Sequence, residues 1–239
     1  MKLLMIHGSR QSGELLRAKS QAMEKLIRQA LAPQRSETVD FHYPTAPFAL
    51  ELSGPPSILR DLHGQWAWWQ SESIDGVYPG LETGLETLAS VLKEEGPFDG
   101  AIGFSQGAAV AAMVASLLEG NREDAFSNSE RDGGIAYPTA FSTLDHSPLK
   151  FVISISGYAA PHRGYHAFYH PQIRTPILHI LGSSDTVVEE HASMKLVESC
   201  QGEEDGIPPL VIYHPGGHVI PSGKRELASI AYFIKSKLN

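Results

Sequence analysis

Six short, nearly continuous apolar runs recur along the chain and predict buried β-strands. They cover residues 3–6, 38–43, 100–104, 151–155, 177–181 and 210–213. Continuous apolar character, as opposed to alternation, is typical of strands that are covered on both faces. The pattern therefore predicts a mainly parallel central sheet.

Apolar residues spaced three or four apart predict amphipathic helices between these strands. The three clearest sets are Leu15, Ala18, Ala22, Leu26 and Ala30; Leu81, Leu85, Leu88 and Leu92; and Leu227, Ile230, Ile234 and Leu238. Thr186 and Glu189 fit a capping box that opens a helix over about 187–199. Strands that alternate with helices predict an α/β fold of three layers, with helices on both faces of the sheet.

Two segments interrupt this alternation, at about 47–80 and 119–147. The second contains "GNREDAFSNSERDGG", has little periodicity and indicates an exposed excursion, not a domain boundary. Internal repeats and Gly/Ser linkers are absent from the sequence. We therefore expect a single domain over 1–239.

Composition and charge exclude several classes of function. A formal net charge of −8 over 239 residues disfavours a nucleic acid or an anionic membrane as partner. The single cysteine, Cys200, rules out an internal disulfide and a multi-cysteine metal site. The N-terminus lacks the features of a signal peptide, and no apolar run reaches the ~20 residues of a membrane span. These features predict a cytoplasmic protein.

The stretch "DGAIGFSQGAAVAAMVASLL" places Ser105 between a predicted strand and a predicted helix, within a G-x-S-x-G motif. Gly103 and Gly107 would permit a turn too tight for bulkier side chains. A serine there lies at the carboxyl end of a parallel strand, where α/β sheets place their functional sites. Ser105 is accordingly a candidate nucleophile. The alternative is a helix N-cap on a plain strand–turn–helix.

A serine nucleophile needs a base, and on this type of sheet the chain order is serine, acid, histidine. His191, His214 and His218 follow a plausible acid. We favour His218, because "YHPGGHVIP" places it on a glycine-rich loop after the last predicted strand. His214 and His218 are spaced like a helical metal pair, but the intervening Pro and Gly residues make zinc binding a poor explanation.

The acid is expected on the loop that precedes the histidine. Asp185 follows a predicted strand directly in "ILGSSDTVV", and Glu189 and Glu190 are its rivals. Asp185 could also serve only as a carboxylate near a helix N-terminus. Together with Ser105 and His218, it completes a candidate triad.

The first predicted strand ends in "HGSRQSG". The amide of Ser9, or that of Arg10, is placed there to donate to an oxyanion together with the amide of Gln106. A Gly-Ser loop before an amphipathic helix also resembles the phosphate cradle of flavin mononucleotide reductases. A flavin-binding oxidoreductase is therefore an alternative, as is a catalytically silent binding module.

The segments "HGSRQSG", "GFSQGAA", "ISGY", "LGSSDTVV" and "HPGGHVIP" together resemble the FSH (family of serine hydrolases) group of the α/β-hydrolase superfamily. The resemblance implies a Ser105–His218–Asp185 triad, an oxyanion hole from the amides of Ser9 and Gln106, and no metal or organic cofactor. It also implies a small-molecule ester or acyl thioester substrate. Some fungal members release polyketide acyl chains from an acyl carrier protein as thioesterases.

Aromatic side chains suggest where an acyl group could bind. Trp66, Trp68, Trp69 and Tyr158 could line an apolar pocket, or the tryptophans could simply pack in the core. The sequence favours neither explanation.

Overall fold

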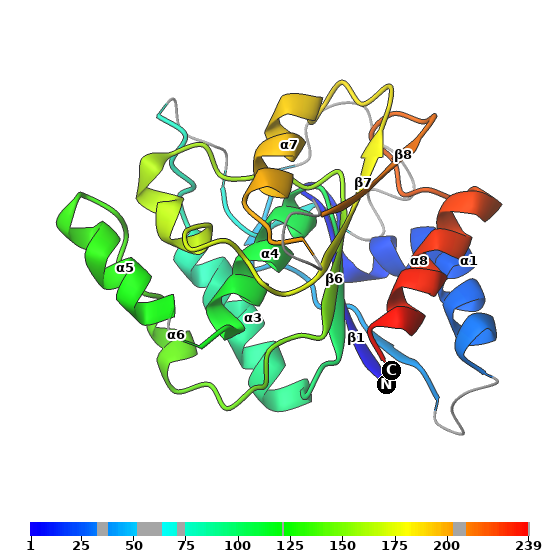
Figure 1. Cartoon of the computed structure of the whole chain (residues 1–239), viewed down its shortest axis with the longest axis horizontal. Coiled ribbons are helices and arrows are strands. Elements are labelled where there is room, and N and C mark those ends of the chain that lie inside the picture. The colour runs from blue at the N-terminus through cyan, green and yellow to red at the C-terminus, as the bar shows by residue number, and fades with distance from the viewer. Residues whose placement is uncertain (33–37, 52–63, 71–74, 121, 203–208, 239) are drawn as a thin grey trace.

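The computed structural model describes residues 1–32, 38–51, 64–70, 75–120, 122–202 and 209–238, in which strands and helices alternate (Figure 1). All six predicted strands are confirmed, although β2 is shorter than its apolar run. They are β1 (Lys2–Ile6), β2 (Asp40–His42), β5 (Gly100–Phe104), β6 (Phe151–Ile155), β7 (Ile177–Gly182) and β8 (Leu210–His214).

The six strands form one sheet in the order β2-β1-β5-β6-β7-β8, and every neighbouring pair is parallel. The chain first runs outward from β1 to β2 and then returns to pair β5 with the other edge of β1. The carboxyl ends of β1 and β5 therefore flank the point where the strand order reverses. Such a point is where open α/β sheets leave a crevice for ligands.

Helices cover both faces of the sheet, so the predicted three-layer α/β fold is confirmed (Figure 1). The helices of one face are α1 (Gly13–Leu31) and α8 (Lys224–Ser236). Those of the other are α3 (Leu81–Glu95), α4 (Gln106–Leu118), α5 (Arg122–Arg131), α6 (Thr139–Ser142), the 3₁₀ helix η1 (Arg163–Phe168) and α7 (Glu190–Glu198). None of the helices in the described ranges is both long and apolar enough to cross a membrane.

The helix α4 is the centre of one of the two hydrophobic cores. All of its residues are buried, which explains why its sequence is apolar all round and rich in alanine. Small side chains let its backbone approach the sheet closely. The second core lies between the sheet and the pair α1 and α8, which pack against each other. The fold thus fixes the start of α4 firmly at the sheet's carboxyl edge.

The predicted start of the helix over 187–199 is wrong. The helix α7 begins at Glu190, and its N-cap Glu189 makes no side-chain capping bond. Instead of a Thr186–Glu189 capping box, one carboxylate oxygen of Asp185 accepts hydrogen bonds from the amides of Val187 and Val188. The carboxylate thus closes a local turn over 185–188 ahead of the helix, in place of the expected capping box.

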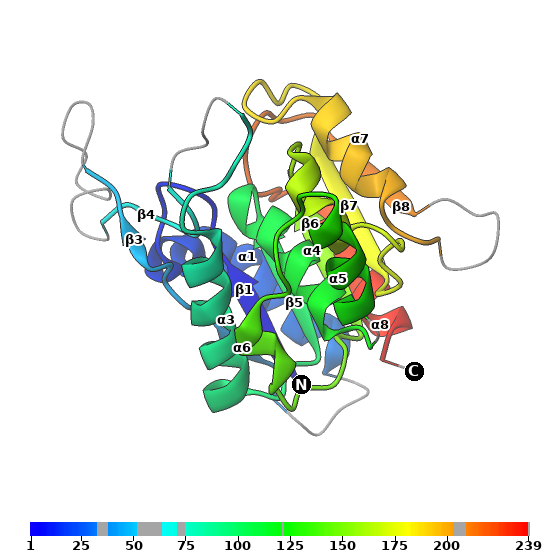
Figure 2. The same cartoon turned by 90° about the vertical axis from the view of Figure 1, so that its left-hand side faces the viewer.

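The first excursion, at 47–80, is described in part. Its residues 52–63 and 71–74 lie outside the described residues, whereas β3 (Phe48–Ala49) and β4 (Trp66–Ala67) form an antiparallel ribbon. Figure 2 shows this ribbon outside the main sheet, on the side of α3. The amide of Arg10 donates to the carbonyl of Trp66 at 2.9 Å, which ties the ribbon to the loop after β1.

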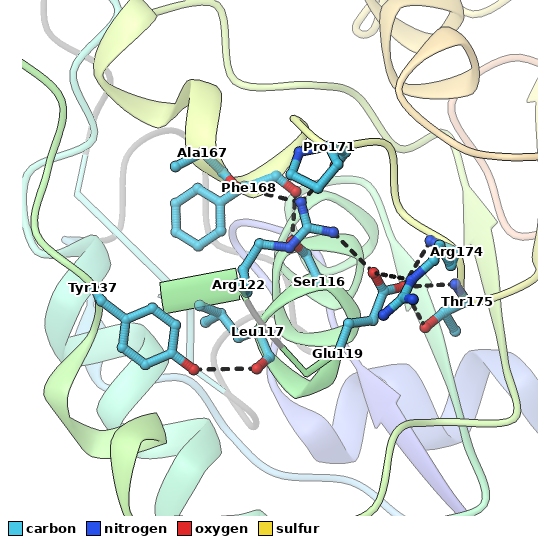
Figure 3. A network of polar contacts seen from close by, with 10 residues as sticks. All are labelled: Ser116, Leu117, Glu119, Arg122, Tyr137, Ala167, Phe168, Pro171, Arg174 and Thr175. Atoms are coloured by element: carbon cyan, nitrogen blue, oxygen red, sulfur yellow. Dashed lines mark hydrogen bonds and ion pairs between the residues drawn. The ribbon is translucent and has the colours of Figure 1, made fainter. Parts of the chain in front are cut away.

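The second excursion, 119–147, is largely exposed, as its sequence indicates, but it is also helical in part. It contains α5 and α6, and α5 packs against η1 and α4. At its start Glu119 and Arg122 are both buried and form an ion pair of 2.8 Å (Figure 3). The segment begins at the C-terminus of α4, about 20 Å along that helix from Ser105.

The buried pair anchors three stretches of chain to one another. Glu119 accepts hydrogen bonds from the amides of Arg174 and Thr175 and from the Thr175 hydroxyl, whereas Arg122 donates to the carbonyl of Pro171 (Figure 3). The excursion is thereby joined to η1 and to the segment that leads into β7. Glu119 and Arg122 thus stabilise packing at the end of α4 that is remote from Ser105.

Candidate active site

Ser105 lies on a sharp turn between β5 and α4. Its backbone has φ 55° and ψ −122°, a conformation that residues other than glycine rarely adopt. A Cβ added at Gly103 would lie 2.4 Å from the carbonyl oxygen of Gly107, and one added at Gly107 would lie 2.2 Å from that of Ile6. The structure thus accounts for both glycines of the motif. The Ser105 hydroxyl caps no amide of α4, in contrast to the N-cap alternative.

The structure brings together the three residues of the candidate triad. The Nε2 atom of His218 lies 2.9 Å from Oγ of Ser105, and its Nδ1 atom lies 2.8 Å from Oδ2 of Asp185. The His218 side chain is 17% exposed and that of Asp185 is 5% exposed. The imidazole also packs on the ring of Phe104 at 4.8 Å. A base therefore contacts the serine, and a carboxylate contacts the base.

The environment of Asp185 favours its charged form. Burial alone would raise the pKa of this carboxyl, but hydrogen bonds from Val188, His218 and Val187 hold the pKa below its ordinary value. One oxygen faces the two amides and the other faces the imidazole. This division fixes the orientation of the carboxylate toward His218.

The rival residues have other hydrogen-bond and ion-pair partners. His191 is exposed and pairs with Glu189 at 3.1 Å, whereas the hydroxyl of Tyr213 donates to Glu190. His214 is buried at the end of β8, where its Nδ1 accepts from the amide of Gly216 at 3.2 Å. None of these side chains contacts Ser105 in the part of the chain that the structure describes.

Two backbone amides border the space in front of Ser105. Ser9 and Gln106 line the same cavity as Ser105, and within the described ranges neither amide donates a hydrogen bond. The amide of Arg10 donates to the carbonyl of Trp66, so of the two candidate amides on that loop only that of Ser9 donates no hydrogen bond within the described ranges. An added Cβ at Gly8 would lie 3.1 Å from Cβ of Ser105, so glycine lets this loop approach the serine.

A cavity of about 480 Å³ opens beside Ser105. Most of its wall is aromatic or aliphatic, whereas α7 and its N-cap contribute polar side chains. The apolar and aromatic lining residues are Tyr78, Tyr158, Ala159, Pro161, Val187, Val188 and Ala192, and the polar ones from α7 and its N-cap are Glu189, His191 and Lys195. A mostly apolar wall with few polar groups is typical of a pocket for a small organic ligand.

The tryptophans pack behind this cavity and do not line it. Trp68 and Trp69 are buried, and Trp66 packs against the same core. Trp69 stacks on Tyr78 with a ring-centre distance of 4.4 Å. Of the four aromatic residues considered from the sequence, Tyr158 alone lines the cavity, and Tyr78 was not singled out.

Two further polar residues support the site without being recognisable from the sequence. The Nε2 atom of His7 accepts from the amide of Ala46 at 3.0 Å, so its Nδ1–H donates to the carbonyl of Gly8 at 2.7 Å. Burial lowers the pKa of His7 to about 4 and keeps this imidazole neutral. The side chain of Gln106 accepts from the amide of Trp68 at 2.8 Å. The contacts of His7 with Ala46 and of Gln106 with Trp68 each span more than 35 residues, so no local sequence pattern predicts them.

The loop after β1 offers little to a phosphate group. Besides the bond of Arg10 to Trp66, the amide of Gly13 donates to the Thr45 hydroxyl and that of Leu15 donates to the Ser12 hydroxyl. A phosphate cradle needs such amides free. The bonds at Arg10 and Gly13 weaken the flavin-binding alternative.

Comparison with known proteins places the chain in a family. The family model described as serine hydrolase (FSH1) matches residues 1–230. An esterase OVCA2 of Danio rerio is 28% identical over 98% of this chain and 96% of its own length. A dihydrofolate reductase of Schizosaccharomyces pombe is 30% identical over 92% of this chain but only 44% of its own length. The chain spans 50% of a second relative from that yeast, a hydrolase.

Solved structures show the same fold at lower identity. The acyl-protein thioesterase 2 of Zea mays superposes with a TM-score of 0.59 at 18% identity, over 100% of this chain and 94% of the other. Esterase PE8 superposes with a TM-score of 0.58. The chain therefore has the α/β-hydrolase fold and belongs to the FSH1 serine hydrolase family.

Proposed function

We propose that this protein hydrolyses carboxylic esters or acyl thioesters through a Ser105–His218–Asp185 triad and an acyl-enzyme. The observation that carries the proposal is the pair of contacts at His218, 2.9 Å to Ser105 and 2.8 Å to Asp185. A serine hydroxyl is a poor nucleophile near neutral pH unless a positioned base accepts its proton.

The reaction follows from this geometry in two halves. Nε2 of His218 accepts the proton of Ser105 while Oγ forms a bond to the substrate carbonyl carbon. The protonated imidazole then gives that proton to the departing alcohol or thiol as its bond to the carbonyl carbon breaks. In the second half, water attacks the acyl carbon while His218 accepts a proton from it. His218 then gives that proton to Oγ of Ser105 as the bond between Oγ and the acyl carbon breaks, and the acid product is released.

The negative charge that develops on the carbonyl oxygen needs donors of its own. The amides of Ser9 and Gln106 are the candidates, because both border the cavity at Ser105. Gln106 is also the first residue of α4, and the positive end of the helix dipole adds to the field there. Asp185, held ionised by its donors, stabilises the protonated form of His218 during each half of the reaction.

The cavity favours a hydrophobic acyl group. Its aromatic and aliphatic wall could bury several methylene groups, each worth about 0.8 kcal/mol. A narrower assignment within this proposal is a thioesterase that releases an acyl or polyketide chain from an acyl carrier protein, in the cytoplasm. It is supported by the family resemblance, and the FSH1 match is compatible with it.

Active-site labelling tests the proposal. Intact mass should show one fluorophosphonate adduct per chain on the wild type and on Ser184→Ala, an exposed serine next to Asp185, but none on Ser105→Ala. Ester hydrolysis by Ser105→Ala should fall by about 10⁴-fold or more. No adduct on folded wild-type protein would instead indicate a catalytically silent binding module.

A series of esters and thioesters of increasing acyl length then tests the substrate class. We expect kcat/KM to rise with chain length until the cavity is filled. A strong preference for acetyl over octanoyl esters would contradict a hydrophobic acyl group.

A further inference from the structure

Ser156 follows β6 at the carboxyl edge of the sheet and has an unusual backbone. Its φ is 49°, in the left-handed region. The other described non-glycine residues with positive φ are Arg10 and Ser105, which follow β1 and β5 at the same edge. Such a conformation costs a residue with a Cβ about 1–2 kcal/mol and is commonly retained at functional sites.

The side chain of Ser156 is buried beside Asp185. The residue is 1% exposed, and its Oγ makes no hydrogen bond of normal geometry within the described residues. A small cavity of about 60 Å³ is lined by both Ser156 and Asp185. The Ser156 hydroxyl adds, after Val188, His218 and Val187, to the interactions that hold the pKa of Asp185 below its ordinary value.

The backbone at this position has no need of a serine. Glycine adopts positive φ without steric cost and would also avoid leaving a hydroxyl buried. The chain instead places here a serine, at a residue that lines the same small cavity as Asp185. The cost of the strained backbone and of the buried hydroxyl is offset if the hydroxyl donates a hydrogen bond to a strong acceptor. The ionised carboxylate of Asp185 is such an acceptor.

We propose that Ser156 is a positioning residue, whose hydroxyl donates to the Asp185 carboxylate and holds it in the orientation that faces His218. Two amides that follow β7 already bind one oxygen of the carboxylate. A donor that follows β6 would hold the carboxylate from a second strand as well. This role rests on the proposed triad. The other ionisable groups around the small cavity are Glu190 and Tyr213, which form a hydrogen bond with each other. His218 contacts the carboxylate oxygen of Asp185 that the two amides do not bind.

The test compares Ser156→Gly and Ser156→Ala with Ser154→Ala. Ser154 is a matched control, since it lies on β6, is also 1% exposed and also has a buried Oγ without a hydrogen bond, but it lines no cavity with Asp185. Fluorophosphonate titration gives the active fraction of each variant, so that rates are expressed per assembled site. The Gly variant relieves the strained φ and keeps the test valid if the Ala variant fails to fold.

For Ser156→Gly we expect kcat/KM to fall about 10- to 100-fold, because a hydrogen bond to a charged group is lost, with KM little changed. The acidic limb of the kcat/KM profile should move to lower pH, because a carboxylate free to turn holds protonated His218 less firmly. Ser154→Ala should keep the wild-type rate and limb.

Two results would overturn the assignment. An unchanged kcat/KM in Ser156→Gly would show that Ser156 has no role in the reaction. A lower kcat/KM whose acidic limb stays in place or moves to higher pH would show that its role is only structural. Failure of the triad itself is recognised separately, as a wild type that takes up no fluorophosphonate.

Discussion

The side chain of Gln106 accepts a hydrogen bond from the backbone amide of Trp68 at 2.8 Å, and its Nε2 donates to the carbonyl of Trp69 at 3.4 Å. The residue next to the candidate nucleophile thus holds the segment whose Trp69 stacks on Tyr78, part of the cavity wall. Gln106 thus connects the turn at Ser105 to the pocket wall through its side chain.

Gln106→Ala should therefore loosen the pocket wall without removing the proposed oxyanion donor. The buried amide of Trp68 would lose its acceptor, which costs about 1–3 kcal/mol of unfolding free energy. We expect KM for long-chain esters to rise more than kcat falls, since the backbone amide at 106 is retained. Chemical denaturation and ester kinetics measure both effects.

Gln172→Ala is the control for this prediction. Gln172 is exposed and its side chain donates only to the carbonyl of Glu198, so its loss should leave both quantities near wild type. Equal effects of the two substitutions would contradict a specific role for Gln106.

Substitution of either motif glycine should prevent the turn at Ser105 from forming. In Gly103→Ala and Gly107→Ala the new Cβ would lie within 2.6 Å of backbone atoms that cannot move without displacing α4 or β1. We expect a loss of about 3 kcal/mol or more, or no folded protein. Gly120→Ala is the control, because an added Cβ there meets nothing within 4 Å. Thermal unfolding of the three variants distinguishes these cases, and a Gly107→Ala protein as stable as Gly120→Ala would refute the close packing.

The buried ion pair at the far end of α4 should matter for stability but not for the site. Glu119→Ala leaves the Arg122 guanidinium, with a 2% exposed side chain, without its carboxylate. Breaking such a pair costs about 3–5 kcal/mol. Asp124→Ala, an exposed acid two residues past Arg122, should cost less than about 0.5 kcal/mol. Activity per molecule labelled by fluorophosphonate should equal that of wild type in both variants, and a reduced value in Glu119→Ala would show that the pair acts on the site.

The sequence predicts the main sheet well because its strands are buried on both faces. Each strand is then a run of apolar residues, and such runs are visible without knowledge of the partner. The two-residue strands β3 and β4 leave no periodicity to detect. The predicted start of α7 is wrong for a different reason: the Asp185 carboxylate, and not the Thr186 side chain, accepts from the amides of this segment, and the helix begins only at Glu190.

The candidate triad also follows from the sequence, because each of its residues comes directly after a strand or on a glycine-rich loop. Parallel strands bring those positions to one edge whatever the intervening chain does. The supporting residues do not follow. His7, the Gln106 side chain and the Glu119–Arg122 pair depend on partners fixed only by the tertiary fold, and Arg122 in "REDAFSNSER" reads as a solvated charge.

The last prediction concerns acid stability. Burial lowers the pKa of His179, which lies in β7 with its Nε2 unpartnered, from 6.5 to about 4. The unfolded chain takes up a proton on this imidazole as the pH falls through 6.5, whereas the folded protein does so only near 4. Stability is therefore lost progressively as the pH falls from about 6.5 toward 4. Between pH 7.5 and 5 this histidine alone accounts for a loss of about 2 kcal/mol.

His179→Gln removes the titrating group and should reduce the acid-induced loss of unfolding free energy by about 2 kcal/mol over that interval. Urea unfolding at pH 7.5 and pH 5 measures the loss, and the comparison within each variant cancels any change in packing caused by the substitution itself. His191→Gln serves as the control for removal of an exposed histidine. If both variants lost as much stability as wild type, protonation of His179 would not be what weakens the fold in acid.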